Sequence, residues 1–155
     1  MKNENFTINE IEQKLKRYCS YQDRCHSEVE KKLKEFDLIE EAKNKILFNL
    51  INENYLNESR FSENFVRGKF KIKNWGKIKI VQELKSRNIS DINIKRGLME
   101  IDEVEYKNKL ENIFIKKLSS LENQSVINKK KKIFSYLSYR GWETSLIYEK
   151  INKIQ

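Results

Sequence analysis

The stretch IKIVQELKSRNI, residues 78–89, has the pattern of a helix with a defined end. Leu84 is followed four positions later by Asn88 and five positions later by Ile89. In a Schellman helix ending, the C′ residue takes a left-handed conformation that Gly and Asn accept readily, and the apolar C″ residue packs back on C3. The spacing therefore predicts a helix with Leu84 at C3 and Asn88 at C′.

The same ending is predicted for two other stretches, SEVEKKLKEFDL (27–38) and KKIFSYLSYRGW (131–142). The equivalent positions are Leu33, Asp37 and Leu38 in the first stretch, and Leu137, Gly141 and Trp142 in the second. The three leucines are 51 and 53 residues apart. A regular period of this length is typical of a repeat protein in which each unit is a small group of helices.

Further helical patterns lie on both sides of each of these three helices. Capping-box sequences, in which Ser, Thr or Asp precedes Glu by three positions, predict helix starts at Thr7-x-x-Glu10, Ser27-x-x-Glu30 and Asp102-x-x-Glu105. Apolar residues at helical spacing, such as Ile92 with Leu98, predict the buried faces. The pattern indicates nine helices in three triplets.

Composition supports a helical fold, because the chain has no proline and only four glycines, and a β fold rich in turns needs more of both. We therefore predict an all-α protein of three tandem three-helix repeats that form an elongated, curved array. The predicted repeats are residues 1–56, 57–101 and 102–155.

One segment, FKIKNWGKIKI at residues 70–80, has an alternative interpretation. Apolar and basic residues alternate on both sides of Asn74-Trp75-Gly76, which by period alone predicts a β-hairpin. We favour helices, because the repeat places residues 78–87 on a helix and because a lone hairpin is only marginally stable. The Asn74-Trp75-Gly76 segment then becomes the connection between two helices.

The positive charge of the chain is concentrated in its middle. The formal net charge is +9, from 32 basic and 23 acidic side chains. Residues 66–96 alone carry 10 basic and 2 acidic side chains, whereas residues 1–65 carry 11 basic and 13 acidic ones. An overall bias toward lysine would spread the charge evenly, so the concentration favours an anionic partner such as nucleic acid or an acidic protein surface.

The candidate contact residues follow from this distribution. Trp75 is an aromatic candidate for stacking or for a protein interface, although a buried anchor at the turn is an equally good interpretation. The run of four lysines at 129–132 is predicted in the first helical turn, where cations oppose the helix dipole, which suggests a functional use. The full set is Arg67, Lys69, Lys71, Lys73, Trp75, Lys77, Lys79, Lys85, Arg87, Lys95, Arg96, Lys129, Lys130, Lys131 and Lys132.

Residues that could support catalysis or metal binding are few. His26 is the only histidine, and we expect it in a loop just before a cap at Ser27. Cys19 and Cys25 lack the CxxC spacing of a zinc site and are expected to be reduced thiols. Phosphate-binding, dinucleotide-binding, hydrolase and zinc-protease motifs do not occur in the sequence. We therefore predict no catalytic residue, cofactor or metal.

Hydropathy predicts neither a signal peptide nor a membrane span, because no window approaches the ~18 apolar residues that a span needs. We expect a cytoplasmic monomer.

Three stretches of the chain resemble the RecX family. They are HSEVEKKL (26–33), NYLNESRFSENFVRGK (54–69) and WGKIKIVQELKSRNI (75–89). The second is the most specific, and it differs from the family pattern where Asn54 replaces a glycine and Ser62 an alanine. The order and spacing of the three stretches also agree with the family.

This resemblance implies three tandem helical repeats that bind in the groove of the RecA–single-stranded-DNA filament and restrain filament growth, strand exchange and co-protease activity. The family has no catalytic residues to carry over. Two alternatives remain open on the sequence. One is a helical protein that binds single- or double-stranded DNA without RecA, and the other is a helical-repeat adaptor whose charge is incidental.

Overall fold

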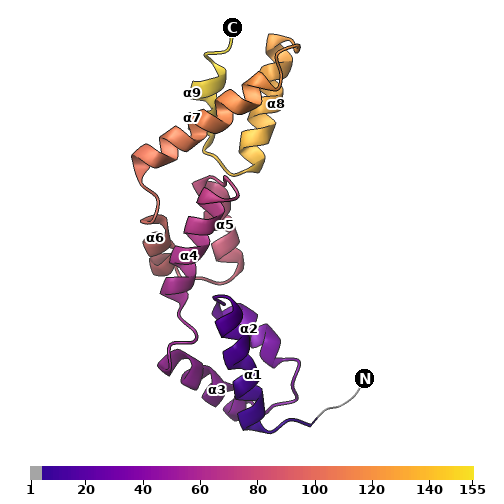
Figure 1. Cartoon of the computed structure of the whole chain (residues 1–155), viewed down its shortest axis with the longest axis vertical. Helices are drawn as coiled ribbons and strands as arrows, with labels where there is room; N and C mark the ends of the chain where they lie inside the picture. The colour runs from indigo at the N-terminus through magenta and orange to yellow at the C-terminus, as the bar shows by residue number, and fades with distance from the viewer. Residues whose placement is uncertain (1–4) are drawn as a thin grey trace.

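The computed structural model describes residues 5–155, and this part of the chain contains nine α-helices and no strand. Figure 1 shows the helices stacked along one long axis, with the first helices at one end and the C-terminus at the other. The predictions of an all-α fold and an elongated helical array are confirmed. The helices are α1 (Ile8–Tyr21), α2 (His26–Leu33), α3 (Glu40–Asn52), α4 (Glu58–Lys71), α5 (Lys77–Ser86), α6 (Asp91–Leu98), α7 (Glu103–Ser119), α8 (Val126–Tyr139) and α9 (Thr144–Ile151).

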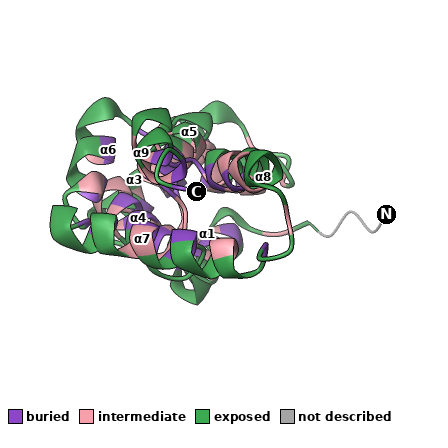
Figure 2. Cartoon of the chain, turned by 90° about the horizontal axis from the view of Figure 1, so that it is seen from above, coloured by how far each residue is buried: buried purple, intermediate pink, exposed green. Residues whose placement is uncertain are grey.

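We refer to α1–α3, α4–α6 and α7–α9 as the N-terminal, middle and C-terminal groups. The segment at 70–80 is the end of α4, a turn at residues 72–76 and the start of α5, so the helical interpretation of this segment is confirmed. Viewed along the long axis in Figure 2, buried residues face the inside of the array and exposed residues cover the outside. The limits given above for the three repeats stay a prediction.

Two separate hydrophobic cores hold the helices together. The first belongs to the N-terminal group and consists of Ile11, Leu15, Cys19, Val29, Leu33, Ile46, Leu50 and Leu56. The second is continuous through the middle and C-terminal groups, and its fully buried members include Val66, Ile80, Leu84, Ile133, Leu137 and Ile147. The middle and C-terminal groups therefore share one core, to which Cys25 at the start of α2 also belongs, whereas the other buried residues of the N-terminal group named above form a core of their own.

The predicted caps are confirmed at Thr7, which forms a complete capping box with Glu10, and at Asp102, whose side chain accepts from a backbone N–H in the first turn of α7. The cap predicted at Ser27 is wrong. The N-cap of α2 is Cys25, two residues earlier, so the helix begins at His26, and the backbone N–H of Cys25 donates to Glu28 at 3.1 Å. His26 therefore lies in the first helical turn rather than in a loop.

Two of the three predicted Schellman endings are confirmed. The N–H of Ile89 donates to the carbonyl of Leu84 at 3.2 Å, with Asn88 at φ 58°. The equivalent bond from Trp142 to Leu137 is 3.1 Å, with Gly141 at φ 83°. The repeated spacing in the sequence thus reflects a real backbone structure.

The third predicted ending, at Asp37, is wrong. Asp37 is not in the left-handed region, and the N–H of Leu38 donates to Phe36 instead of Leu33. Aspartate accepts left-handed φ less readily than Gly or Asn. A Schellman ending closes α3 instead, where the N–H of Tyr55 donates to Leu50 at 2.8 Å and Asn54 has φ 64°.

Two smaller expectations are also wrong. Ile92 is 67% exposed, and Ile94 occupies the buried face of α6 instead. The lysine run 129–132 lies beyond the first turn of α8, because this helix begins at Val126 with Ser125 as its cap. The conflict between these lysines and the helix dipole therefore does not arise.

Candidate functional site

The start of α5 is capped by the end of α8. Gly76 is the N-cap residue and has no side chain to offer, so the first N–H groups of the helix need other acceptors. The N–H of Gly76 donates to the carbonyl of Arg140 at 2.8 Å, and the N–H of Ile78 donates to the carbonyl of Gly141 at 3.0 Å. The Tyr106 hydroxyl accepts the N–H of Lys77 at 3.0 Å. The C-terminal group thus supplies all three acceptors.

This junction leaves no space for side chains at its two glycines. A Cβ on Gly76 would lie 2.4 Å from the carbonyl oxygen of Gly141, and a Cβ on Gly141 would lie 2.2 Å from the Cβ of Lys79. The indole N–H of the fully buried Trp142 donates to the carbonyl of Asn74 at 3.1 Å and adds a further bond across the junction. The turn that carries Trp75 is therefore held firmly against the end of α8.

Cations and aromatic rings alternate beside this junction. The Nζ atom of Lys69 lies 4.8 Å from the centre of the Trp75 ring and 5.4 Å from that of Phe65. The Nζ atom of Lys79 lies 4.6 Å from the Trp75 ring and 4.4 Å from the Tyr139 ring on α8. We call this surface the cation–aromatic strip, and its residues are Phe65, Lys69, Trp75, Lys79, Arg87 and Tyr139.

The strip continues into a shallow pocket between α7 and α8. The Tyr136 ring lies one turn before Tyr139, with the Arg140 guanidinium 3.6 Å and the Lys117 Nζ 4.7 Å from its centre. We call this the α7–α8 pocket, and it is lined by Lys117, Lys131, Lys132, Ser135, Tyr136, Tyr139 and Arg140.

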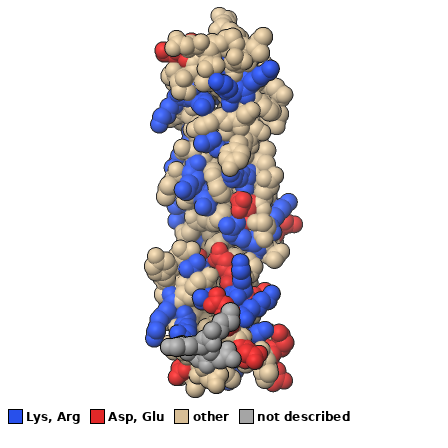
Figure 3. Space-filling view, turned by 90° about the vertical axis from the view of Figure 1, so that its right-hand side faces the viewer, with Lys and Arg blue, Asp and Glu red and all other residues tan. Residues whose placement is uncertain are grey.

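The strip is electrostatically unbalanced. Among residues 5–155, neither Lys69 nor Lys79 has a carboxylate oxygen within 4.0 Å, whereas Arg87 pairs with Glu83 at 2.8 Å. Figure 3 shows Lys and Arg along the whole length of the side on which α5 and α8 lie, while Asp and Glu gather mainly over the N-terminal group. An anionic partner would meet the least opposition on the middle and C-terminal groups.

Six of the predicted contact residues belong to this surface. Lys69, Trp75, Lys79 and Arg87 lie in the strip, and Lys131 and Lys132 line the pocket. Trp75 is half-buried and packs on the shared core, with two lysine ammonium groups over its ring, so the interpretation as an anchor is supported and its part in an interface stays a prediction. Lys73 lies beside the strip, in a hollow that Phe65 and Lys69 also line.

The other predicted residues lie apart from the strip or have other partners. Arg67 pairs with Glu100 at 3.0 Å and Lys77 with Glu103. Lys95 and Arg96 are on α6, which Figures 1 and 2 place on the opposite side of the array from α8. Lys71 and Lys85 are exposed, and Lys129 and Lys130 are half-buried.

The sequence interpretation missed Phe65, Lys117, Tyr136, Tyr139 and Arg140. The sequence does contain a signal for three of them. Tyr136 lies four residues after Lys132, Tyr139 three residues after Tyr136, and Arg140 directly after Tyr139. These spacings place all four on one face of a helix. The search for charge alone overlooked the tyrosines.

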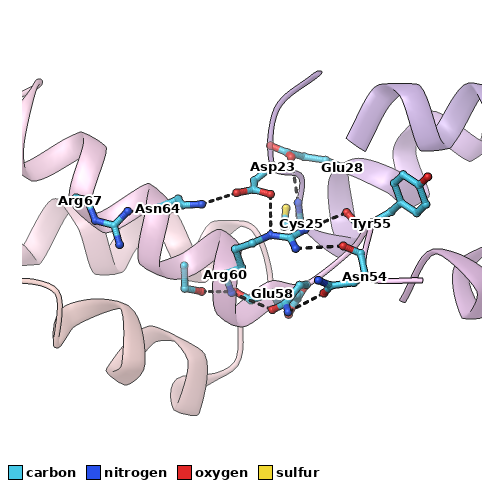
Figure 4. Close-up of polar contacts among 11 residues, drawn as sticks. Asp23, Cys25, Glu28, Asn54, Tyr55, Glu58, Arg60, Asn64 and Arg67 are labelled. Carbon is cyan, nitrogen blue, oxygen red and sulfur yellow. Dashed lines mark hydrogen bonds and ion pairs between the residues drawn. The ribbon is translucent and has the colours of Figure 1, made fainter. Parts of the chain in front are cut away.

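A second junction joins the N-terminal group to α4 and α5, and its contacts are mainly polar (Figure 4). Arg60 pairs with Asp23 at 3.0 Å and donates to the carbonyls of Asn54 and Tyr55. The Ser27 hydroxyl donates to the carbonyl of Arg87 at 3.1 Å. Arg87 ends α5 and Arg140 ends α8, and the two occupy equivalent places. The carbonyl of Arg87 accepts a bond from the start of α2, and the carbonyl of Arg140 accepts one from the start of α5.

The thiols and the histidine lie near this second junction. Burial raises the pKa of Cys19 to about 11, so the group stays protonated near neutral pH. Cys25 is fully buried with its Sγ 3.2 Å from the Ser27 hydroxyl, and His26 Nδ1 is 4.0 Å from a Glu58 oxygen. No set of three or more His, Cys, Asp and Glu residues within 5–155 is arranged to hold a metal ion. None of the helices described is long and apolar enough to span a membrane.

Comparisons with known proteins agree with this architecture. A family model described as the second three-helix domain of RecX matches residues 57–98, which include α4, α5 and α6. The "Regulatory protein RecX" of Pelodictyon phaeoclathratiforme is 30% identical over 122 residues, which cover 77% of this chain and 74% of the relative. The chain belongs to the RecX family.

Other members of the RecX family support the assignment. The relative from Prosthecochloris aestuarii is 25% identical over 88% of both chains. The crystal structure of RecX from Lactobacillus salivarius has a TM-score of 0.82 with 25% identity, and covers 94% of this chain and 95% of that one. Some relatives are longer, since the match covers 48% of the Oceanobacillus iheyensis protein and 33% of the Streptococcus uberis protein.

Proposed function

We propose that this RecX-family protein binds the RecA–single-stranded-DNA filament through its cation–aromatic strip and restrains recombinase and co-protease activity. It does so without catalysis, as a monomer in the cytoplasm, with repeats 1–56, 57–101 and 102–155 as its structural units. Family membership supports the partner, and the strip is the one observation that carries the choice of surface. Its lysines Lys69 and Lys79 lack carboxylate partners among the described residues, so they are available to an acidic or phosphate-bearing partner.

The rigid α5–α8 junction supports a role for this surface as a preformed template. Backbone hydrogen bonds of 2.8 and 3.0 Å hold Trp75 and Lys79 beside Tyr139. Residues already ordered before binding lose less conformational entropy on association. An elongated array also suits contact with several units of a regular filament, because its surface extends along one axis (Figure 1).

The proposal can be tested by co-sedimentation with RecA filaments and by RecA strand exchange, using a charge-reversal variant. We expect the combined change of Lys69, Lys79, Lys131 and Lys132 to Glu to abolish both co-sedimentation and inhibition. The matched control reverses Arg17, Lys31, Lys34 and Lys45, which are exposed cations of the N-terminal group. If the wild-type protein neither sediments with the filament nor inhibits strand exchange at any stoichiometry, the proposal is wrong.

A second candidate function is DNA binding that does not require RecA. The exposed Tyr139 ring beside Lys79 favours it, because a ring next to a free cation is a common feature of nucleic-acid surfaces. This function predicts tight, steeply salt-dependent binding to DNA alone, whereas filament binding predicts weak binding to DNA alone. An adaptor whose charge is incidental would be unaffected by the charge reversal.

A further inference from the structure

The α7–α8 pocket has a lining in which every side chain is a cation, a tyrosine or a hydroxyl. Four of the seven lining residues are Lys117, Lys131, Lys132 and Arg140, and none is acidic. The other three are Ser135, Tyr136 and Tyr139. A pocket of this composition attracts a ligand that offers both negative charge and a flat ring or other polarisable surface.

Its two tyrosines have different roles. Tyr136 is half-buried and packs against the shared core, with Arg140 and Lys117 against its ring. Tyr139 is 76% exposed and is not part of either core. Among the described residues, Lys79 is the one cation over this ring, with its Nζ 4.4 Å from the ring centre. Tyr139 therefore contributes ring surface rather than packing.

Two lysines of the pocket carry positive charge that no nearby carboxylate among the described residues balances. Lys131 and Lys132 are exposed, and Lys132 donates only to the neutral side-chain oxygen of Gln124, at 3.1 Å. Within residues 5–155, no carboxylate oxygen lies within 4.0 Å of either Nζ atom. Their charges are thus free to meet a ligand.

We propose that the α7–α8 pocket binds one nucleotide unit of single-stranded DNA, with the base stacked on Tyr139 and the flanking phosphates at Lys131, Lys132 and Arg140. This inference rests on the proposed function for the choice of DNA, because a filament regulator meets DNA as a single strand. Stacking on a protein side chain requires an unstacked base, which a single strand offers and a duplex does not. An acidic protein surface would use the cations but would gain little from the exposed ring.

The pocket is also continuous with the strip. Tyr139 belongs to both, so Trp75, Lys79, Tyr139 and Lys131 form a path from the middle group to the C-terminal group. A strand that follows this path would find aromatic rings and cations alternating along it, as bases and phosphates alternate along a nucleic acid.

Fluorescence anisotropy with the full chain and labelled oligo(dT) of about ten nucleotides, without RecA, tests the inference. An abasic oligomer with the same backbone serves as a second probe. We expect Tyr139→Ala to bind oligo(dT) about five- to a hundred-fold more weakly and to bind the abasic oligomer unchanged. Tyr139→Phe, which keeps the ring, is expected to bind both probes like the wild type.

The charged part of the pocket has its own variant. Lys131→Gln combined with Lys132→Gln should weaken the binding of both probes. The slope of log K against log salt concentration should become less steep by about 1.4, because two phosphate contacts are lost. The matched controls are Tyr21→Ala, at a tyrosine that is 84% exposed on α1, and Lys31→Gln combined with Lys34→Gln on α2. Both controls are expected to leave the binding constants unchanged.

Four outcomes overturn the inference. The first is an oligo(dT) affinity of Tyr139→Ala equal to that of the wild type. The second is a loss of affinity of Tyr139→Ala for the abasic oligomer equal to its loss for oligo(dT). The third is a loss of affinity in the control variants equal to that in the pocket variants. The fourth is competition between polyglutamate and oligo(dT) for the wild-type protein, together with weaker polyglutamate binding by Tyr139→Ala. That result would assign the pocket to an acidic protein. Because the assay contains no RecA, filament binding can persist or fail independently.

Discussion

At the scale of single residues, three Schellman endings show when a left-handed position requires glycine. Asn54, Asn88 and Gly141 all have positive φ at the C′ position. Asn54 and Asn88 are exposed, so their side chains have space, whereas a Cβ on Gly141 would collide with the backbone of Lys79. Backbone conformation alone thus permits Asn or Gly, and the close approach of a neighbouring helix is what restricts position 141 to glycine.

Gly141→Ala is therefore expected to destabilise the protein by roughly 2–4 kcal/mol, through strain at positive φ and displacement of α5. Gly68→Ala is the matched control. Gly68 lies inside α4 with no atom within 4 Å of an added Cβ, so this change should stabilise the protein by about 0.5–1 kcal/mol. Urea unfolding measures both, and equal effects of the two changes would contradict the prediction.

Tyr106→Phe tests the hydroxyl that connects α5 to the C-terminal group. The Tyr106 hydroxyl donates to Glu143 at 2.6 Å and accepts from the N–H of Lys77, and its loss should cost about 1–3 kcal/mol of unfolding free energy. Thermal or urea unfolding near neutral pH measures this cost. A variant as stable as the wild type would show that the hydroxyl is dispensable.

The same residue predicts a pH dependence. Burial, and next the hydrogen bond to Glu143, raise the pKa of Tyr106 above its usual value. Its unfolded-state pKa is about 10. Its contribution to stability is thus fully present below about pH 10 and is lost as pH rises further, because the unfolded chain then releases a proton that the folded chain keeps. The fall in stability above pH 10 should be smaller in Tyr106→Phe.

At the scale of helices, α5 is held at both ends by other groups of the array. Its first N–H groups donate to carbonyls at the end of α8, and the carbonyl of its C-cap residue Arg87 accepts from Ser27 on α2. Helices α8, α5 and α2 therefore follow one another end to end. This arrangement satisfies backbone groups that an isolated helix would leave to water.

Helix α4 is also connected to the preceding group through its first turn. The Arg60 guanidinium there pairs with Asp23 and donates to two carbonyls of the turn before the helix. We expect Arg60→Lys to lose most of the stability that Arg60→Ala loses, because an ammonium group cannot reach all three acceptors as the planar guanidinium does. Because both side chains are about a third exposed, a double-mutant cycle with Asp23→Ala should give a coupling of only about 0.5–1 kcal/mol. Full rescue by lysine would contradict this role.

At the scale of the whole molecule, the division into two cores predicts unequal stability along the array. The N-terminal group has its own core and meets the rest through polar contacts and the buried Cys25, whereas the middle and C-terminal groups share one continuous core. Polar contacts that are partly exposed contribute little to stability compared with shared apolar packing.

Native-state hydrogen exchange should therefore show two cooperative units. We expect amides of α4, α5, α7 and α8 to open together with the highest free energy, and those of α1–α3 to open separately with a lower one. Leu137→Ala should lower the protection of α5 as well as α8, because Leu137 and Leu84 belong to the same core. Uniform protection along the whole chain would contradict this prediction.

Much of this organisation was predictable from the sequence. The all-α class, the helix ends at Asn88 and Gly141 and the caps at Thr7 and Asp102 follow from backbone chemistry that acts within a few residues. That Ser27 does not cap α2 was not predictable, because its hydroxyl donates instead to a carbonyl 60 residues away. Six of the fifteen predicted contact residues lie in the strip or the α7–α8 pocket, and the others do not, since charge alone does not say which way a helix faces.

The sequence by itself determined the fold class, the repeat and the excess of positive charge in the middle of the chain, because periodicity, turn chemistry and composition are local properties. Only the tertiary structure decided which cations meet aromatic rings. Lys79 and Tyr139 are 60 positions apart in the chain and become neighbours because the end of α8 caps the start of α5. The candidate site thus depends on a junction between two groups, and packing across that junction has no signature in either group's sequence alone.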